Sequence, residues 1–258
     1  MSIRAENVDV RFGGIKALAG VSVEIPVGRI VAVVGPNGSG KSTLFNTISG
    51  LVPLAGGKIL IDELDVCGVS PADRVRLGVA RTFQTPRFDP AQTVEDAVRC
   101  GFFPSIRTGM LSAMLRLSGT SREEATVHEG CRELLSRFGL THLARVPLAE
   151  LSMGQLRMVE VVRAVANKPK YILLDEPAAG LSSDEQATLA DQVRAVAASG
   201  VGTLLVEHNF NLIRQLAEYV FVLDRGLPIL QGTPAEIESN EEFVSLYLGK
   251  RRSAGKPS

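Results

Sequence analysis

Short apolar runs that alternate with helical stretches dominate the chain. Ile30–Val34 is continuous and β-branched, which is typical of a strand buried on both faces of a parallel sheet. Residues 171–174 and Gly202–Val206 have the same character, and helical spacing follows them over Ser183–Ala198 and residues 210–218. Strands and helices in this order predict an α/β fold built on a parallel sheet.

Other strands are shorter or alternate between apolar and polar positions. Residues 21–25 alternate cleanly and end at Pro26, and residues 3–12 alternate loosely. Such alternation predicts strands with one face buried and one face toward water. We also expect short strands at residues 58–62, 79–83, 219–223 and 228–230, and short helices at residues 234–237 and 241–247.

The middle of the chain, residues 93–167, has helical spacing instead. A Ser/Thr followed three residues later by Asp or Glu predicts capped helix starts at Thr93 and at Ser121. We expect a third helix over residues 156–167, whereas residues 102–117 are apolar and interrupted by proline. Residues 93–167 are therefore predicted to form a helical insertion within the α/β order.

The length of 258 residues allows one large domain or two small ones. Because the α/β order resumes after the helical stretch, we expect a single domain over residues 3–249. Its α/β core consists of residues 3–92 and 168–249, with residues 93–167 as a helical subdomain inserted between them. Residues 250–258 are basic and polar, and we expect a disordered tail there.

Composition excludes several classes of function. Lys and Arg together number 28, as do Asp and Glu, so the formal net charge is zero. A nucleic-acid-binding domain usually has a basic excess, so we expect no nucleic-acid partner. Three scattered cysteines suit a reducing cytoplasm better than a disulfide framework or a zinc site.

Hydropathy bears on the cellular location. No apolar run approaches the roughly 20 residues that a membrane helix needs. The first residues also lack the apolar core of a signal peptide. We therefore expect a cytoplasmic protein whose role at a membrane depends on a partner.

The stretch from Gly35 to Ser42 fits the phosphate-loop pattern G-x-x-x-x-G-K-[ST]. It lies between the buried strand Ile30–Val34 and residues 43–50, which resemble a helix closed by a glycine. This is the strand–loop–helix setting that the pattern requires. The residues predicted to surround the phosphates of a nucleotide are Gly35, Pro36, Asn37, Gly38, Ser39, Gly40, Lys41, Ser42 and Thr43.

Each residue type in this loop suits phosphate binding. Gly35, Gly38 and Gly40 let the backbone turn tightly, so that consecutive N–H groups point at phosphate oxygens. The start of the following helix adds positive potential. Lys41 supplies a full charge for the β- and γ-phosphates, and the Ser42 hydroxyl suits Mg²⁺. A glycine-rich turn without a ligand is the alternative, and the flanking strand and helix disfavour it.

Two carboxylates follow the buried strand at residues 171–174. This is the end of a strand at which open α/β sheets present their ligands. Asp175 is placed to hold the shell of Mg²⁺, and Glu176 can polarise an attacking water. An ordinary turn at a strand end explains such a pair about as well, but the phosphate loop favours the functional interpretation.

The motifs taken together indicate a family. In chain order they are the phosphate loop, Gln84, Leu-Ser-Met-Gly-Gln at residues 151–155, residues 171–176, residues 178–182 and His208, and they resemble the ATP-binding subunit of an ABC transporter over residues 3–249. The resemblance implies a P-loop NTPase (RecA-like) core with an N-terminal antiparallel β region and an inserted α-helical subdomain. It also implies an ATPase that uses ATP and Mg²⁺.

The resemblance assigns further roles. Phe12 matches the aromatic residue that stacks on adenine, although packing in the core explains a phenylalanine equally well. Gln84 matches the glutamine that reaches Mg²⁺ and the attacking water and responds to the membrane subunit. His208 matches the switch histidine that contacts the γ-phosphate, and its place just after a buried strand favours this over a surface histidine. The residues that match the signature, which caps ATP bound on the opposite subunit, are Ser152, Gly154 and Gln155.

Two positions depart from the family pattern. Met153 stands where the signature usually has glycine, and we expect its side chain to point away from phosphate. Ser182 stands where the loop after Glu176 usually ends in aspartate, which leaves the contact of that residue across the subunits open.

Finer motifs indicate a subtype and its partners. Residues 81–86, 178–181, 207–209 and 247–249 are similar to the branched-chain amino acid uptake group. Urea or amides remain open as the cargo. A lipid-linked export system, a soluble ABC ATPase outside transport and a nucleotide-binding regulator without turnover remain open as alternative functions.

The implied partners are a second ABC ATPase subunit in a head-to-tail dimer, transmembrane permease subunits and, indirectly, a solute-binding protein. The location is then cytoplasmic and peripheral, on the inner face of the membrane. We expect a cleft between the loop of Gln84 and residues 102–117 to receive a helix of the permease.

Overall fold

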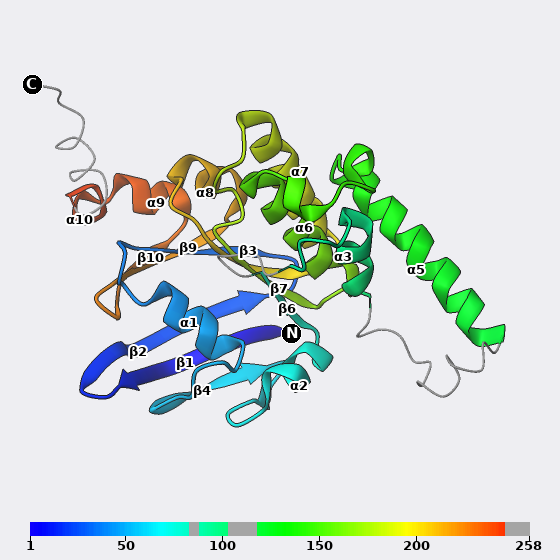
Figure 1. The fold of residues 1–258 in the computed structure, drawn as a ribbon. Helices are drawn as coiled ribbons and strands as arrows, with labels where there is room; N and C mark the ends of the chain where they lie inside the picture. The colour runs from blue at the N-terminus through cyan, green and yellow to red at the C-terminus, as the bar shows by residue number, and fades with distance from the viewer. Residues whose placement is uncertain (83–87, 103–117, 246–258) are drawn as a thin grey trace, which may run out of the picture.

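The computed structural model describes residues 1–82, 88–102 and 118–245, with only the backbone described over residues 118–123. Two sheets with helices around them form the framework (Figure 1). Within these ranges the larger sheet has six strands in the order β10-β9-β3-β8-β7-β6, and the smaller has four in the order β2-β1-β4-β5.

The larger sheet is the parallel one. All of its pairings are parallel except that of β10 with β9. Every residue of β3, β7 and β8 is buried, as continuous apolar strands covered on both faces should be. Its strands are β3 (Ile30–Val34), β6 (Val79–Arg81), β7 (Tyr171–Asp175), β8 (Gly202–Val206), β9 (Tyr219–Asp224) and β10 (Leu227–Gly232).

The smaller sheet is antiparallel throughout and comes from the N-terminal part of the chain. Burial alternates along β2, where Val21 and Val23 are buried and Ser22 is exposed, which confirms the predicted alternation. The strand begins at Ile15, earlier than the clean alternation indicated. The strands of this sheet are β1 (Ser2–Phe12), β2 (Ile15–Pro26), β4 (Gly56–Ile61) and β5 (Leu64–Asp65).

Helix α1 (Lys41–Ile48) lies between the two sheets (Figure 1). Its buried side chains Leu44, Phe45 and Ile48 belong to one core that also contains residues of β1, β2 and β3. The phosphate loop immediately precedes this helix. Packing between two sheets therefore fixes the helix that follows the loop, and with it the position of the loop.

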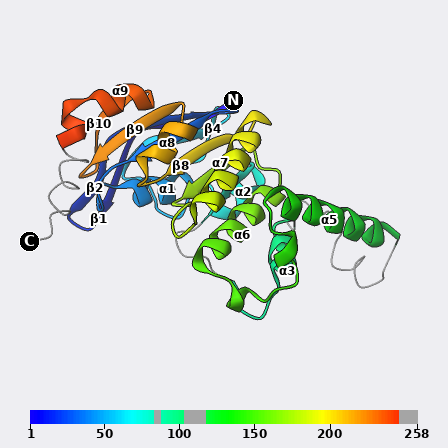
Figure 2. The same cartoon turned by 90° about the horizontal axis from the view of Figure 1, so that it is seen from above.

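The other face of the larger sheet is covered by helices (Figures 1 and 2). Val94, Leu134 and Met158 of these helices share a core with Ile172 of β7. Because this core is continuous, the division at residues 93–167 into a separate subdomain stays a prediction. The helices on this face include α3 (Val94–Cys100), α5 (Ser118–Arg137), α6 (Met153–Ala166), α7 (Ser183–Ala198) and α8 (Phe210–Leu216).

Short elements complete the chain. Residues 71–76 form a one-turn helix before β6, and two 3-10 turns separate α5 from α6. These elements are α2 (Pro71–Arg76), η2 (Thr141–Leu143), η3 (Leu148–Glu150), α9 (Pro234–Ser239) and α10 (Glu241–Phe243). The helices in the described ranges are all too short or too polar to cross a lipid bilayer.

The helix start predicted at Thr93 agrees with the structure, whereas the starts predicted at residues 121 and 156 differ from it. Thr93 caps α3 through a capping box with Asp96, as predicted. The predicted start at Ser121 is wrong, because α5 already begins at Ser118. A Ser followed three residues later by Glu also occurs inside helices, where residues three apart lie on the same face. The start predicted at residue 156 is also wrong, because Ser152 caps α6 and the helix begins at Met153.

Some predictions fall outside the described residues. These are the end of the strand at residue 83, the glutamine Gln84, most of the apolar segment 102–117 and the tail 250–258. The permease cleft expected beside Gln84 therefore stays a prediction.

Candidate active site

The phosphate loop joins the end of β3 to the start of α1, and its shape depends on glycine. A Cβ atom at Gly35 would lie 2.2 Å from the carbonyl oxygen of Leu223. At Gly40, with φ at 103°, a Cβ atom would lie 2.7 Å from a side-chain carbon of Leu18. The loop thus passes so close to its neighbours that only glycine fits at these positions.

The side chain of Lys41 binds backbone carbonyls of its own loop. Its Nζ donates hydrogen bonds to the carbonyl oxygens of Gly35, at 2.7 Å, and Pro36, at 3.0 Å. Burial lowers the pKa of Lys41, whereas the nearby carboxylates of Glu176 and Asp175 raise it. These carbonyls hold the buried ammonium group over the loop, where it can exchange them for phosphate oxygens.

The loop also contains an unpaired polar atom. Ser39 is buried, and its Oγ has no hydrogen-bond partner among the described residues. A buried hydroxyl without a partner costs about 1–3 kcal/mol, so such groups usually have a ligand or water. Together with Lys41 and the N-terminus of α1, this donor set fits a phosphate chain.

Asp175 ends β7 beside the loop and is 5% exposed. Its backbone N–H donates to the hydroxyl of Thr82, at 3.0 Å, and its Oδ2 lies 3.8 Å from the guanidinium of Arg81. Burial raises the pKa of Asp175, and Arg81 acts against that shift. A buried carboxylate with few donors is a suitable ligand for a divalent cation, and Ser42 at the start of α1 adds a hydroxyl.

Glu176 has a left-handed backbone, with φ at 49°. This conformation costs about 1 kcal/mol in a residue other than glycine. Hydrogen bonds hold it, because its N–H donates to the carbonyl of Val206, at 2.9 Å, and its own carbonyl accepts from Arg157, at 2.5 Å. The turn aims the carboxylate at His208, whose Nε2 lies 2.7 Å from Oε1 of Glu176.

A second cluster forms at the start of α6. Ser152 and Gln155 make a reciprocal capping box, in which the Ser152 N–H donates to the Gln155 side chain at 2.9 Å and the Gln155 N–H donates to Oγ at 3.1 Å. A Cβ atom at Gly154 would lie 2.6 Å from the carbonyl oxygen of Gly180. The helix start therefore packs tightly against the loop at residues 178–182.

Comparison with known proteins decides what this arrangement is. The family model described as "ABC transporter" matches residues 18–179. The chain belongs to the ABC transporter family. As an ABC cassette it is an ATPase and binds nucleotide, and the P-loop NTPase fold predicted from the sequence is confirmed.

The chain is similar over most of its length to a transport protein and to two solved ATP-binding cassettes. The chain is 33% identical over 242 residues to the "High-affinity branched-chain amino acid transport ATP-binding protein LivG" of Salmonella typhimurium, covering 93% of this chain and 95% of that one. It superposes on the ADP conformation of the ATP-binding cassette MJ1267 with a TM-score of 0.82 and 31% identity, covering 96% and 99%. A dimeric post-hydrolysis structure of the cassette MJ0796 with ADP and Pi has a TM-score of 0.77 and 25% identity, covering 90% and 98%.

The structure brings most of the predicted residues of the ABC cassette together. The loop with Lys41, the pair Asp175 and Glu176, and His208 all lie at the carboxyl ends of neighbouring strands β3, β7 and β8. Phe12 is 51% exposed at the end of β1 and belongs to neither core, so core packing does not explain it. Its contact with adenine stays a prediction.

Several residues of the site were missed. Arg157 reaches the Glu176 carbonyl from α6, and Glu207 accepts the N–H groups of Ala178 and His208. Arg81 donates to Asn46 on α1 and to Ser49 directly after it, and it faces Asp175. A charged residue directly after the apolar strand at residues 202–206 was a signal for Glu207, whereas no pattern in the sequence marks Arg157.

The departure at Ser182 has a local explanation. Its hydroxyl caps α7 and shares a capping box with Glu185, whose carboxylate accepts the Ser182 N–H at 2.8 Å. Serine at this position therefore stabilises the helix that follows the loop by about 1 kcal/mol. Its contact across subunits stays open.

The two neighbouring residues at the start of α6 should respond differently to substitution. Met153 is 53% exposed, so Met153→Gly should change the ATPase rate by less than about threefold, with a helix-propensity cost of up to about 1 kcal/mol. Ser152→Arg removes the cap of α6, worth about 1 kcal/mol, and adds bulk at the predicted phosphate contact, so turnover should fall at least tenfold. Steady-state hydrolysis with thermal melting of both variants is the measurement. Loss of turnover in Met153→Gly alone would reverse our view of which side faces ATP.

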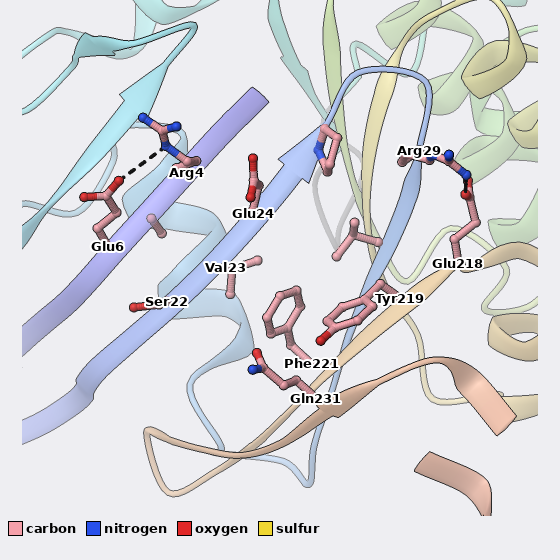
Figure 3. A pocket seen from close by; sticks show the side chains of 13 residues that line it. Arg4, Glu6, Ser22, Val23, Glu24, Arg29, Glu218, Tyr219, Phe221 and Gln231 are labelled. Atoms are coloured by element: carbon pink, nitrogen blue, oxygen red, sulfur yellow. Dashed lines mark hydrogen bonds and ion pairs between the residues drawn. The ribbon is translucent and has the colours of Figure 1, made fainter. Parts of the chain in front are cut away.

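A cavity among the described residues lies elsewhere. It has a volume of about 570 Å³ and opens between the two sheets, with an apolar floor that includes Val23 and Phe221 (Figure 3). Arg4 with Glu6, and Arg29 with Glu218, form ion pairs at its rim. None of the predicted site residues that the structure describes lines it. The candidate active site lies instead at the carboxyl ends of β3, β7 and β8.

Proposed function

We propose that this ABC ATPase powers the import of branched-chain amino acids through a separate membrane permease. The similarity to LivG, across nearly the whole of both chains, supports this cargo. The observation that carries the catalytic part is the contact of 2.7 Å between Glu176 and His208 beside the phosphate loop. The residue roles below follow from this proposal.

The phosphate loop binds ATP. Backbone N–H groups of residues 35–43 and the Nζ of Lys41 hold the phosphates of ATP, and the Phe12 ring stacks on adenine. Ser42 and Asp175 hold Mg²⁺, with Gln84 as a further ligand. When bound, Mg²⁺ neutralises charge on the phosphate oxygens.

The residues that follow β7 and β8 carry out the hydrolysis of ATP. The Glu176 carboxylate accepts a hydrogen bond from the attacking water and polarises it. The imidazole of His208 holds that carboxylate before ATP binds and donates toward the γ-phosphate once ATP is bound. The proton on Nε2 can serve only one acceptor at a time, so binding of ATP exchanges its partner from Glu176 to the phosphate.

The site is completed by a second cassette. Ser152, Gly154 and Gln155 at the start of α6 present a hydroxyl, a backbone N–H and an amide to the γ-phosphate of ATP on the opposite subunit. The dimeric structure of MJ0796, a similar cassette, supports a dimer. Two sites then form between two head-to-tail subunits, from one phosphate loop and one signature each.

The remaining partners follow from the cargo. Permease subunits cross the membrane, and a solute-binding protein delivers amino acids to them without touching the cassette. The cassette then works in the cytoplasm, on the inner face of the membrane, with no nucleic-acid partner.

Dimer formation tests the proposed arrangement. The Glu176→Gln variant should elute as a dimer in size-exclusion chromatography with ATP and as a monomer without it. The run includes a sample with the cognate partner cassette, in case the dimer is heteromeric. Ser152→Arg in the Glu176→Gln background is the matched control and should stay monomeric. A monomer under all conditions would contradict the sandwich arrangement.

A further inference from the structure

Glu207 is a buried carboxylate that directly precedes the predicted switch histidine. It is 4% exposed. Its Oε1 accepts the backbone N–H of Ala178 at 2.9 Å, and its Oε2 accepts that of His208 at 3.2 Å. Burial raises the pKa of Glu207, while the amides of Ala178, His208 and Asn209 favour its charged form.

These bonds close a ring around the hydrolytic pair. From Glu176 the backbone runs two residues to Ala178, which donates to Glu207. Glu207 is bonded covalently to His208, and the His208 side chain returns to Glu176 at 2.7 Å. The Glu176 N–H is also tied to Val206, one residue before Glu207. The Glu207 carboxylate is thus the only side chain in this ring besides Glu176 and His208 themselves.

We propose that Glu207 is a positioning residue for ATP hydrolysis. By tying residue 178 to the amide of His208, its carboxylate sets the distance between the His208 ring and the Glu176 carboxylate. The inference rests on the proposed function, in which Glu176 and His208 act at the γ-phosphate. Glu207 acts only through these two residues and touches neither ATP nor water in the reaction.

The same ring reaches the start of α6, which belongs to the proposed subunit interface. Ala178 begins the loop at residues 178–182, and Gly180 in that loop lies against Gly154 at the start of α6. Arg157 from the same helix donates to the Glu176 carbonyl. A signature helix that engages the opposite ATP is therefore joined to the hydrolytic pair by two routes, and the Glu207 carboxylate holds the loop in one of them.

The chemistry of the carboxylate predicts which substitution is informative. The amides of Ala178 and His208, which bind the two oxygens, are N–H donors, so both oxygens must accept. Glutamine has one accepting oxygen and one NH₂ group, so Glu207→Gln sets a donor against a donor at nearly unchanged volume. Misplacement of a reacting group by about 1 Å can cost a hundredfold in rate. We expect kcat to fall by about tenfold to a hundredfold with the KM for ATP within about twofold.

Thr203→Val is the matched control. Thr203 lies on β8, the strand that leads to Glu207, and is fully buried, with its Oγ1 unpartnered among the described residues. Valine has nearly the same shape, so this variant perturbs the same strand without touching the ring. Its kcat should stay within about twofold of wild type. Glu207→Asp keeps the charge but shortens the side chain, and its kcat should lie between those of wild type and Glu207→Gln.

The experiment combines these variants with Glu176→Gln. A residue that acts through Glu176 should have no further effect once Glu176 is disabled, whereas an independent contribution to stability should add. ATP hydrolysis by the purified chain is measured for wild type, Glu207→Gln, Glu207→Asp, Thr203→Val, Glu176→Gln and the double variant. We expect the double variant to hydrolyse ATP within about twofold of Glu176→Gln.

Distinct outcomes separate the two claims. A slow Glu176→Gln variant together with wild-type turnover in Glu207→Gln would overturn the positioning role and leave the proposed function intact. Additive losses, or a raised KM with a lowered melting temperature and an equally impaired Glu207→Asp, would also overturn it in favour of a structural role. Wild-type turnover in Glu176→Gln would overturn the proposed function, and this inference with it.

Discussion

Lys41→Ala should lose productive ATP binding, with the affinity for ATP reduced at least a hundredfold. Lys41 is 6% exposed, and its ammonium group already lies over the loop, bound to the carbonyls of Gly35 and Pro36. Preorganised charge of this kind acts where water is excluded. Loss of one such donor from an active site typically lowers the reaction rate by about a hundredfold to a thousandfold. Two carboxylates nearby, the buried Asp175 and the partly buried Glu176, would then face the phosphates without the charge of Lys41.

Titration with a fluorescent ATP analogue measures the affinity. Lys58→Ala is the matched control, because Lys58 lies on β4 with an exposed side chain and pairs only with Glu6 in the ion pairs described. It should bind ATP as the wild type does. Equal affinities for wild type and Lys41→Ala, in a protein with unchanged melting temperature, would contradict the assignment of the phosphate loop.

Glu176→Gln should bind ATP normally and hydrolyse it about a hundredfold to ten-thousandfold more slowly. The amide keeps the shape of the side chain and can still bond to His208, 2.7 Å away. It cannot take a proton or polarise water as a carboxylate does. Binding depends on the phosphate loop, which this change leaves intact.

Single-turnover hydrolysis and ATP affinity are measured on the same preparation. Glu133→Gln on α5 is the control, because Glu133 is exposed on a helix away from the sheet edge that carries the site, and it should hydrolyse ATP at the wild-type rate. A Glu176→Gln variant that turns over as fast as this control would remove Glu176 from the reaction.

Much of this fold could be predicted because its strands carry strong patterns. Gly202–Val206 and Ser183–Ala198 have the predicted bounds, since the first is a continuous apolar run after a glycine turn and the second is a long stretch of helical period that begins at a cap residue. The start of α6 could not be placed from apolar spacing, because its first turn carries the exposed Met153 and the glycine Gly154.

Some residues of the candidate site could likewise be predicted from the sequence, and others could not. The phosphate loop and the pair Asp175 and Glu176 follow local spacing, so the sequence sufficed. The place of Glu207 directly after an apolar strand was a signal, but the roles of Arg157 and Glu207 could not be assigned, because they depend on hydrogen bonds to backbone groups 19 and 29 residues away. Backbone acceptors and donors exist at every residue, so no residue type marks the partner.

The most direct test is uptake of labelled leucine into proteoliposomes that contain this cassette, its permease subunits and enclosed ATP. The solute-binding protein loaded with leucine is added outside. The account predicts uptake with the wild-type cassette, a loss of at least a hundredfold in that rate with Glu176→Gln, and no uptake of labelled urea with either. Leucine uptake that is equal for the two cassettes, or uptake of urea in place of leucine, would contradict it.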